Sequence, residues 1–288
     1  NFAGYNFTSG TSYAAPHVSG AAALLLQKNP ELHHHEIKSL LLTTVEPVSD
    51  AYGLEFSVHE AGAGRLDIEN AYNAKLIIEP PNFVAFASSD NKVVQKHLKL
   101  KTIDGSFGGN FDVTFDGPKF IKFDEEHLEK NILNVKLSVL EDNFGEHEGK
   151  IRIYHEGIQY VIPFILHYTP GSISIVQQND KLLFDIYHPE EWSFAKISIT
   201  NSKDGRTGTT TTTPDKVASI DVYENAEYWI DAKIRVDGNT SNAFSVIEIN
   251  SLNENQDRVG FIEMPERQIL IVSIAVIGIA VFGLIKRK

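Results

Sequence analysis

A glycine and two hydroxyl residues, Gly10-Thr11-Ser12, stand directly before a long run of small and apolar residues that is typical of a helix. The first N–H groups of such a helix have no intrahelical acceptor, and the positive end of the helix dipole lies beside Ser12. The serine hydroxyl is then exposed for attack on a carbonyl carbon, and the N–H of the same residue can stabilise the developing oxyanion. This pattern predicts acyl transfer, although Gly-Thr-Ser before a helix usually serves only as an N-cap.

The complete eleven-residue string is more specific than its first three residues. Residues 10–20 read GTSYAAPHVSG, which resembles the serine-containing signature of the subtilisin-like protease family at every defining position. The resemblance implies that Ser12 is the catalytic nucleophile and that its backbone amide contributes to the oxyanion hole. It continues through Asn29-Pro30, the segment 36–42 and the stretch 62–67, and so covers roughly residues 1–75.

The order of catalytic residues in this family is Asp, then His, then Ser. The chain begins just before the serine, at Asn1, with neither a Met nor the features of a signal peptide. We therefore expect the Asp, the His and the oxyanion-hole Asn to lie upstream of residue 1. His17, on the same helix, is expected to point away from the Ser12 hydroxyl, so we predict that the 288-residue chain alone is inactive.

Other polar clusters have plainer interpretations. His33-His34-His35 could suggest a metal site, but consecutive residues at a helix start face different directions, so a solvated helix entry is favoured. The acidic stretches 124–126 and 141–142 lack the ligand spacing of a calcium loop. We predict no required cofactor, and a structural Ca²⁺ has no motif to support it.

Several surface features stay open. Asn6 and Asn239 each begin a glycosylation sequon, of which only Asn239 is a reasonable acceptor. The threonine tract after Gly208 is predicted to be an exposed loop tip, with O-glycosylation as the alternative. Trp192 and Trp229 are predicted to be core residues in preference to a carbohydrate platform.

The composition bounds the class of protein. Hydrophobic residues make up 42% of the chain and charged residues 22%, which is ordinary for a folded protein. A formal net charge of -12 argues against a nucleic-acid partner, because phosphate binding needs clustered cations. The chain has no cysteine, which excludes disulfides, thiolate metal sites and cysteine catalysis.

The texture of the sequence changes at Leu76. Residues 1–75, with two helical segments, are expected to be the C-terminal part of an α/β subtilisin-like domain; the helix after Ser12 is apolar almost all round and is predicted to be buried. Beyond Leu76, short β-branched and aromatic runs between turn residues predict two all-β, sandwich-like domains, at 76–169 and 170–256.

The C-terminus has the pattern of a membrane anchor. Residues 269–285 carry no charge and, as a helix, would span roughly 26 Å, which residues from 264 onward would extend slightly. The basic residues 286–288 predict a cytoplasmic tail and an extracellular bulk. A buried core helix and a sorting signal that is clipped off remain alternatives.

Together these features predict a serine endopeptidase that acts on protein or peptide substrates and is tethered by a single span to the outer face of the cell membrane. The first rival is a non-catalytic adhesion or surface-layer protein with a degenerate protease head. The second is a β-rich membrane-anchored binding protein in which the first 75 residues are a remnant; its apolar helix would then be exposed.

Overall fold

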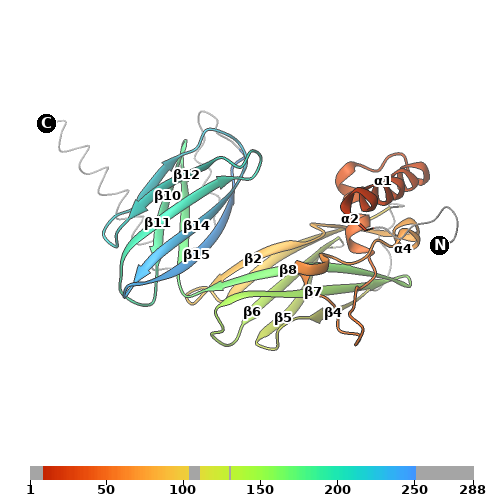
Figure 1. The fold of residues 1–288 in the computed structure, drawn as a ribbon, viewed down its shortest axis with the longest axis horizontal. Helices are drawn as coiled ribbons and strands as arrows, with labels where there is room; N and C mark the ends of the chain where they lie inside the picture. The colour runs from red at the N-terminus through yellow and green to blue at the C-terminus, as the bar shows by residue number, and fades with distance from the viewer. Residues whose placement is uncertain (1–8, 104–110, 130, 251–288) are drawn as a thin grey trace. The chain divides into compact units, whose positions relative to one another are not determined.

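The computed structural model describes residues 9–103, 111–129 and 131–250. The chain divides into two compact units, Asn1–Thr169 and Pro170–Lys288, each with its own hydrophobic core (Figure 1). The described part is mostly β-sheet, as the texture beyond Leu76 predicts. The two units are described separately below.

Four helices open the first unit: α1 (Thr11–Lys28), α2 (His34–Thr43), α3 (Val58–Ala61) and α4 (Ile68–Asn73). The described residues before Leu76 contain, besides these helices, only two isolated β-bridges, Glu46 with Arg65 and Ser49 with Glu55. The α/β sheet expected for this segment is therefore not found among the described residues, and the α/β class stays a prediction.

The prediction that the helix after Ser12 is buried is wrong for the part of the chain that the structure describes. In α1 only Ala21 and Leu25 are buried, while large apolar side chains such as Val18 and Leu24 are 47% and 43% exposed. The apolar composition was correctly recognised, but no described segment packs against most of this helix.

Two four-stranded sheets complete the first unit. One has the order β1 (Leu76–Glu79), β3 (Val93–Thr102), β6 (Ile132–Val139) and β5 (Ile121–Glu129), and the other β2 (Phe83–Ser88), β8 (Ile158–Thr169), β7 (Gly145–His155) and β4 (Asp112–Asp116). All neighbours are antiparallel except β2 and β8, which run parallel. Aromatic side chains fill the space between the sheets: the ring of Phe115 stacks on Phe123 at 5.0 Å and on Phe164 at 5.8 Å.

The second unit also has two sheets. Their orders are β13 (Ala218–Asp221), β10 (Lys181–Tyr187), β9 (Ser172–Gln178), and β12 (Thr207–Thr212), β11 (Trp192–Asn201), β14 (Glu227–Val236), β15 (Asn239–Glu248). Every pairing is antiparallel. Strands β10 and β14 bury alternate residues, because successive side chains of a pleated strand point to opposite faces. Phe184, Ile197 and Ala232, for example, are completely buried in the core of this unit.

Two sequence predictions in the second unit are wrong. The threonine tract is not a loop tip but the edge strand β12, which pairs with β11; β-branched threonine fits an extended strand well. Trp229 is not a core residue, because its position in β14 faces outward and it is 41% exposed. Trp192, in contrast, packs half-buried against the core.

The predicted membrane span, residues 264–285, and the basic tail 286–288 lie outside the described residues. Among the residues that the structure does describe, no helix has both the length and the apolar character needed to cross a membrane.

Candidate functional site

Ser12 is the second residue of α1 and is exposed. The residue before the helix, Gly10, has φ 149° and ψ 151°, a conformation that side chains rarely adopt and that glycine accepts without strain. The chain can therefore turn sharply into the helix, which leaves the Ser12 side chain in the open first turn.

The first turn of α1 also leaves a backbone donor free for an oxyanion. The N–H groups of Tyr13 and Ala14 both donate to the carbonyl of Gly10, at 3.0 and 3.2 Å. The N–H of Ser12 precedes these groups, so the helix itself offers it no acceptor. Hydroxyl and amide of one residue thus lie together at the positive end of an 18-residue helix.

Pro16 lies in the helix interior, as the sixth residue of α1. A proline is well tolerated in the first turn of a helix, where the N–H groups lack partners anyway, but Pro16 lies beyond that turn. A proline has no N–H, so the carbonyl of Ser12, its partner four residues earlier, loses its intrahelical donor. Consequently, neither the N–H nor the carbonyl of Ser12 has its usual hydrogen-bond partner within the helix.

His17 does not serve Ser12 in this structure. Its Nδ1 lies 2.7 Å from the carbonyl oxygen of Tyr13, one turn back along α1, and donates to it. Among the described residues, no histidine or carboxylate is hydrogen-bonded to the Ser12 hydroxyl. The described chain therefore presents a candidate nucleophile and a candidate oxyanion donor, and none of the described residues contacts the Ser12 hydroxyl as a general base.

The C-terminal half of α1 is the part that packs against other helices. Buried Ala21 and Leu25 face α2 and α4, and the ammonium of Lys28 lies 4.2 Å from the centre of the Tyr72 ring and donates to the Tyr72 carbonyl. The position of Ser12 thus depends on α2 and α4, which in turn are fixed to the sheets.

Helix α2 is bonded to the sheets through a buried hydroxyl. Ser39 Oγ donates to the carbonyl of Ile78 at 2.6 Å and accepts from the N–H of the same residue at 3.0 Å. These two bonds satisfy the open edge of β1, whose other edge pairs with β3. Just before, the hydroxyl of fully buried Tyr160 accepts from the N–H groups of Lys75 and Leu76, at 2.8 and 3.1 Å.

Glu36 adds an ionic contact to the same junction. It accepts from the N–H of His33 at 2.8 Å, which caps α2, and forms an ion pair with Lys101 on β3. Burial opposes ionisation of Glu36, but these hydrogen bonds outweigh it and lower its pKa. Of the three consecutive histidines, His35 lies 3.3 Å from the carboxylate of Glu79. No group of metal-ligating side chains is found among the described residues.

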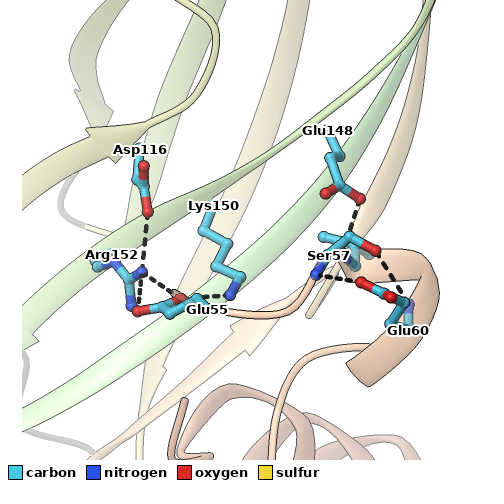
Figure 2. Close-up of polar contacts among 8 residues, drawn as sticks. Glu55, Ser57, Glu60, Asp116, Glu148, Lys150 and Arg152 are labelled. Carbon is cyan, nitrogen blue, oxygen red and sulfur yellow. Dashed lines mark hydrogen bonds and ion pairs between the residues drawn. The ribbon is translucent and has the colours of Figure 1, made fainter. Parts of the chain in front are cut away.

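A second anchor joins the stretch before α3 to β7 and to the edge strand β4 (Figure 2). Glu55 accepts from Lys150 at 2.6 Å and from Arg152 at 3.1 Å, and Arg152 also donates to Asp116 at 3.0 Å. The side chains of Lys150 and Arg152 are only 11% exposed. Burial would raise the pKa of Glu55, but the two cations outweigh this effect and lower it.

The start of α3 is held beside this anchor (Figure 2). Ser57 and Glu60 form a capping box, and Glu148 on β7 accepts from the N–H of Val58 at 2.8 Å. One residue further, His59 lies 2.5 Å from Glu146. Sequence patterns did not reveal these contacts between residues 33–79 and the sheets, because the partners are 39 to 97 positions apart in the chain.

The remaining sequence candidates have local partners or none described. Asp124 pairs with Lys122 at 2.9 Å, and Asp142 pairs with Lys92 and accepts from Tyr168, so both acidic stretches hold ion pairs. Asn239 is exposed at the start of β15, and Asn6 lies outside the described residues.

Comparison with known proteins identifies the segment that carries Ser12. Residues 2–73 match the model of the Subtilase family. The chain is 25% identical over 166 residues to the minor extracellular protease Vpr of Bacillus subtilis, a match that covers 54% of this chain and 20% of that protein. It is 41% identical over 92 residues to the subtilisin-like protease SBT1.4 of Arabidopsis thaliana, covering 28% of this chain and 12% of that protein.

The chain spans about a fifth or less of the length of these two relatives. The match to Vpr also extends beyond the family segment, because residues 2–73 are only a quarter of the chain. Among solved structures, the fn3 domain of the human collagen alpha-1(XX) chain aligns with 31% of this chain and 90% of its own, at 13% identity and a TM-score of 0.25. A TM-score this low does not assign a fold to the sheets of this chain.

Proposed function

We propose that this chain belongs to the subtilase family through residues 2–73 and that it supplies the nucleophile of a serine endopeptidase. Ser12 attacks the carbonyl carbon of a peptide bond, and the Ser12 N–H donates to the oxyanion that forms. The observation that carries the proposal is the exposed hydroxyl of Ser12 in the first turn of α1, together with its amide, for which the described residues provide no hydrogen-bond acceptor.

The base and its orienting carboxylate belong, in this proposal, to a segment upstream of residue 1. A histidine from that segment takes the proton of Ser12 and returns it to the leaving amine, and water then releases the acyl group. The exposed apolar side chains of α1, among them Tyr13, Val18 and Leu24, are the ones that such a segment would cover. The described chain alone is then inactive for want of a base.

Labelling by a fluorophosphonate probe tests this function on the longer protein. Ser12→Ala should abolish the label and lower kcat by a factor on the order of 10⁴ or more, since the nucleophile is lost. Ser19→Ala is the matched control, because Ser19 is exposed on the same helix and donates only to the carbonyl of Ala15, at 3.1 Å. Equal labelling of the Ser12→Ala variant would remove Ser12 from its role.

We further propose that residues 264–285 anchor the protein in the membrane, with the catalytic segment outside. The uncharged run 269–285 and the basic residues after it support this proposal. Deletion of 264–288 should move the protein from the membrane fraction to the medium. No change of fraction on deletion would contradict the anchor. A non-catalytic adhesion protein remains the alternative, and no observation favours it.

A further inference from the structure

Figure 1 shows the sheet β12-β11-β14-β15 of the second unit. Its outer face carries a regular set of polar, aromatic and basic residues. Strand register places these residues in three rows, each read from β12 to β15: Thr207, Thr200, Trp229, Val246; then Thr209, Ser198, Asp231, Phe244; then Thr211, Lys196, Lys233, Asn242. By ordinary strand spacing the rows lie about 7 Å apart and the four strands span about 14 Å.

The first row offers an aromatic platform. Trp229 is 41% exposed, and its Nε1 donates to Glu227 Oε1 at 2.8 Å, which orients the indole ring. An oriented, exposed indole has a flat apolar face and a polar edge, as expected of a surface that binds amphipathic rings. The neighbouring Thr200 and Thr207 share a hydrogen bond of 3.1 Å between their hydroxyls.

The third row places two like charges together. Lys196 and Lys233 lie directly opposite each other on adjacent strands and are both exposed. Like charges in this position destabilise a sheet unless an anion bridges them. Neither lysine has an ion pair with another of the described residues, and Arg235 extends the basic strip along β14. In a chain of net charge -12, a local cationic strip points to an anionic partner.

Between these rows lies a carboxylate with an unsatisfied oxygen. Asp231 is half-buried, and its Oδ1 is buried with no hydrogen-bond partner in the described structure. A buried polar atom without a partner costs free energy, which a donor such as a hydroxyl group would recover. Its neighbour across the strands is Ser198, which adds a further hydroxyl to the same row.

We propose that this face binds an acidic polysaccharide built from uronic acid rings. A sugar ring lies on Trp229, ring hydroxyls donate to Asp231 and meet the Ser198 and Thr209 hydroxyls, and a uronate carboxylate bridges Lys196 and Lys233. Trp229 and Lys233 are four residues apart on one strand, about 13 Å, a distance that two to three linked sugar rings span.

A single-stranded nucleic acid also uses cations and aromatic rings, but this face fits it less well. Nucleic-acid binding depends on many phosphate contacts, and the cations of this face, Lys196, Lys233 and Arg235, supply few of them. A glycan uses Asp231 as a hydroxyl acceptor. The acidic glycan is therefore the partner that matches every row.

Affinity electrophoresis of the full chain in mild detergent tests the proposal. Polygalacturonate in the gel should retard the protein, and added salt should weaken the retardation, because the lysine contacts are screened. Hydroxyethyl cellulose should retard it much less. The retardation should not depend on Ser12, so Ser12→Ala binds like the unmodified chain, and its failure to do so would contradict a site separate from the serine.

Single substitutions locate the site. Trp229→Ala should weaken polygalacturonate binding about tenfold or more, since aromatic anchors dominate binding surfaces. Its control is Tyr223→Ala, which removes an aromatic side chain that is 78% exposed in the loop after β13. Lys233→Gln should weaken binding about threefold, while Lys181→Gln, an equal charge change on β10 of the other sheet, should not.

The proposal is overturned by three results. The first is absence of polygalacturonate binding by the unmodified chain. The second is equal binding by the Trp229→Ala and Lys233→Gln variants, each checked for an unchanged thermal midpoint. The third is tighter binding of an oligo(dT) strand or of hydroxyethyl cellulose than of polygalacturonate, which would assign the face to another partner.

Discussion

Helix α1 and the stretch from α2 to β1 belong to the same compact unit, yet they are held very differently. In α1 only two side chains are buried, and Ser12 lies at the free end. The stretch from α2 to β1 is bonded to the sheets by Ser39, Glu36 and Tyr160. The β-sheets thus fix the rear of the segment that matches the Subtilase family, while the helix that carries the candidate nucleophile is open to a further partner.

This difference assigns a role to the first pair of sheets. One hydrophobic core runs from Leu25 and Leu40 in the helices to Tyr168 at the end of β8. The sheets are therefore packed with the helical segment as one unit, and the boundary at residues 75 and 76 stays a prediction. Four substitutions break or sharpen the contrast between the two parts.

Leu40→Ala should have the largest effect, because this α2 side chain is completely buried in the shared core. We expect a loss of about 2–5 kcal/mol in the free energy of unfolding of the first unit, from lost burial and an unfilled cavity. Urea unfolding of the chain measures it. The control is Leu24→Ala, which changes a 43% exposed residue on α1. An equal loss of unfolding free energy in the two variants would contradict the difference between α1 and α2.

Tyr160→Phe should come next. The change removes only the hydroxyl that accepts from the N–H groups of Lys75 and Leu76. Both N–H groups, at the start of β1, then lose this hydrogen-bond acceptor. Unsatisfied buried groups of this kind cost about 1–3 kcal/mol. Amide exchange at Lys75 and Leu76 should quicken as well. Tyr154→Phe, on an exposed tyrosine, is the control and should leave both measurements unchanged.

Glu55→Gln should destabilise the first unit by about 1–2 kcal/mol near neutral pH, because Lys150 and Arg152 lose their carboxylate partner. The folded-state pKa of Glu55 is lowered, so its contribution is present above the unfolded-state pKa and is lost as pH falls through the folded-state pKa. The difference between the two proteins should therefore shrink in acid.

Thermal unfolding at neutral and acid pH measures the effect of Glu55→Gln. The matched change is Glu46→Gln, whose partner Arg65 is largely exposed, so no measurable shift of the thermal midpoint is expected there. A difference for Glu55→Gln that grows as pH falls would refute the proposed ionic anchor.

Val18→Asp should have the smallest effect in this chain, within about 0.5 kcal/mol, because Val18 is exposed on α1. In the longer protein the same change should destabilise strongly and abolish fluorophosphonate labelling, since the apolar face of α1 would then be covered. Equal stability of the longer protein with and without Val18→Asp would contradict a covering segment.

Local sequence patterns predicted much of the β region, and their failures have physical causes. Residues 135–139 and 151–154 alternate between apolar and polar side chains, which is typical of a strand, and they lie in β6 and β7. Strands β3 and β5 escaped notice because lysine, histidine and acidic residues occupy their outer face, although Leu98 and Leu100 alternate inward in β3. The threonine tract was misjudged because its low complexity masked its β-propensity.

The sequence by itself predicted which segment resembles the subtilases and which residue is the candidate nucleophile, because the signature around Ser12 is contiguous and its chemistry is local. Only the tertiary structure decided what holds that segment. The contacts of Ser39, Glu55 and Tyr160 join residues 39 to 97 positions apart, and no local pattern encodes such pairs. For the same reason, the outward position of Trp229 beside Asp231 and the paired lysines became visible only once strand register was known.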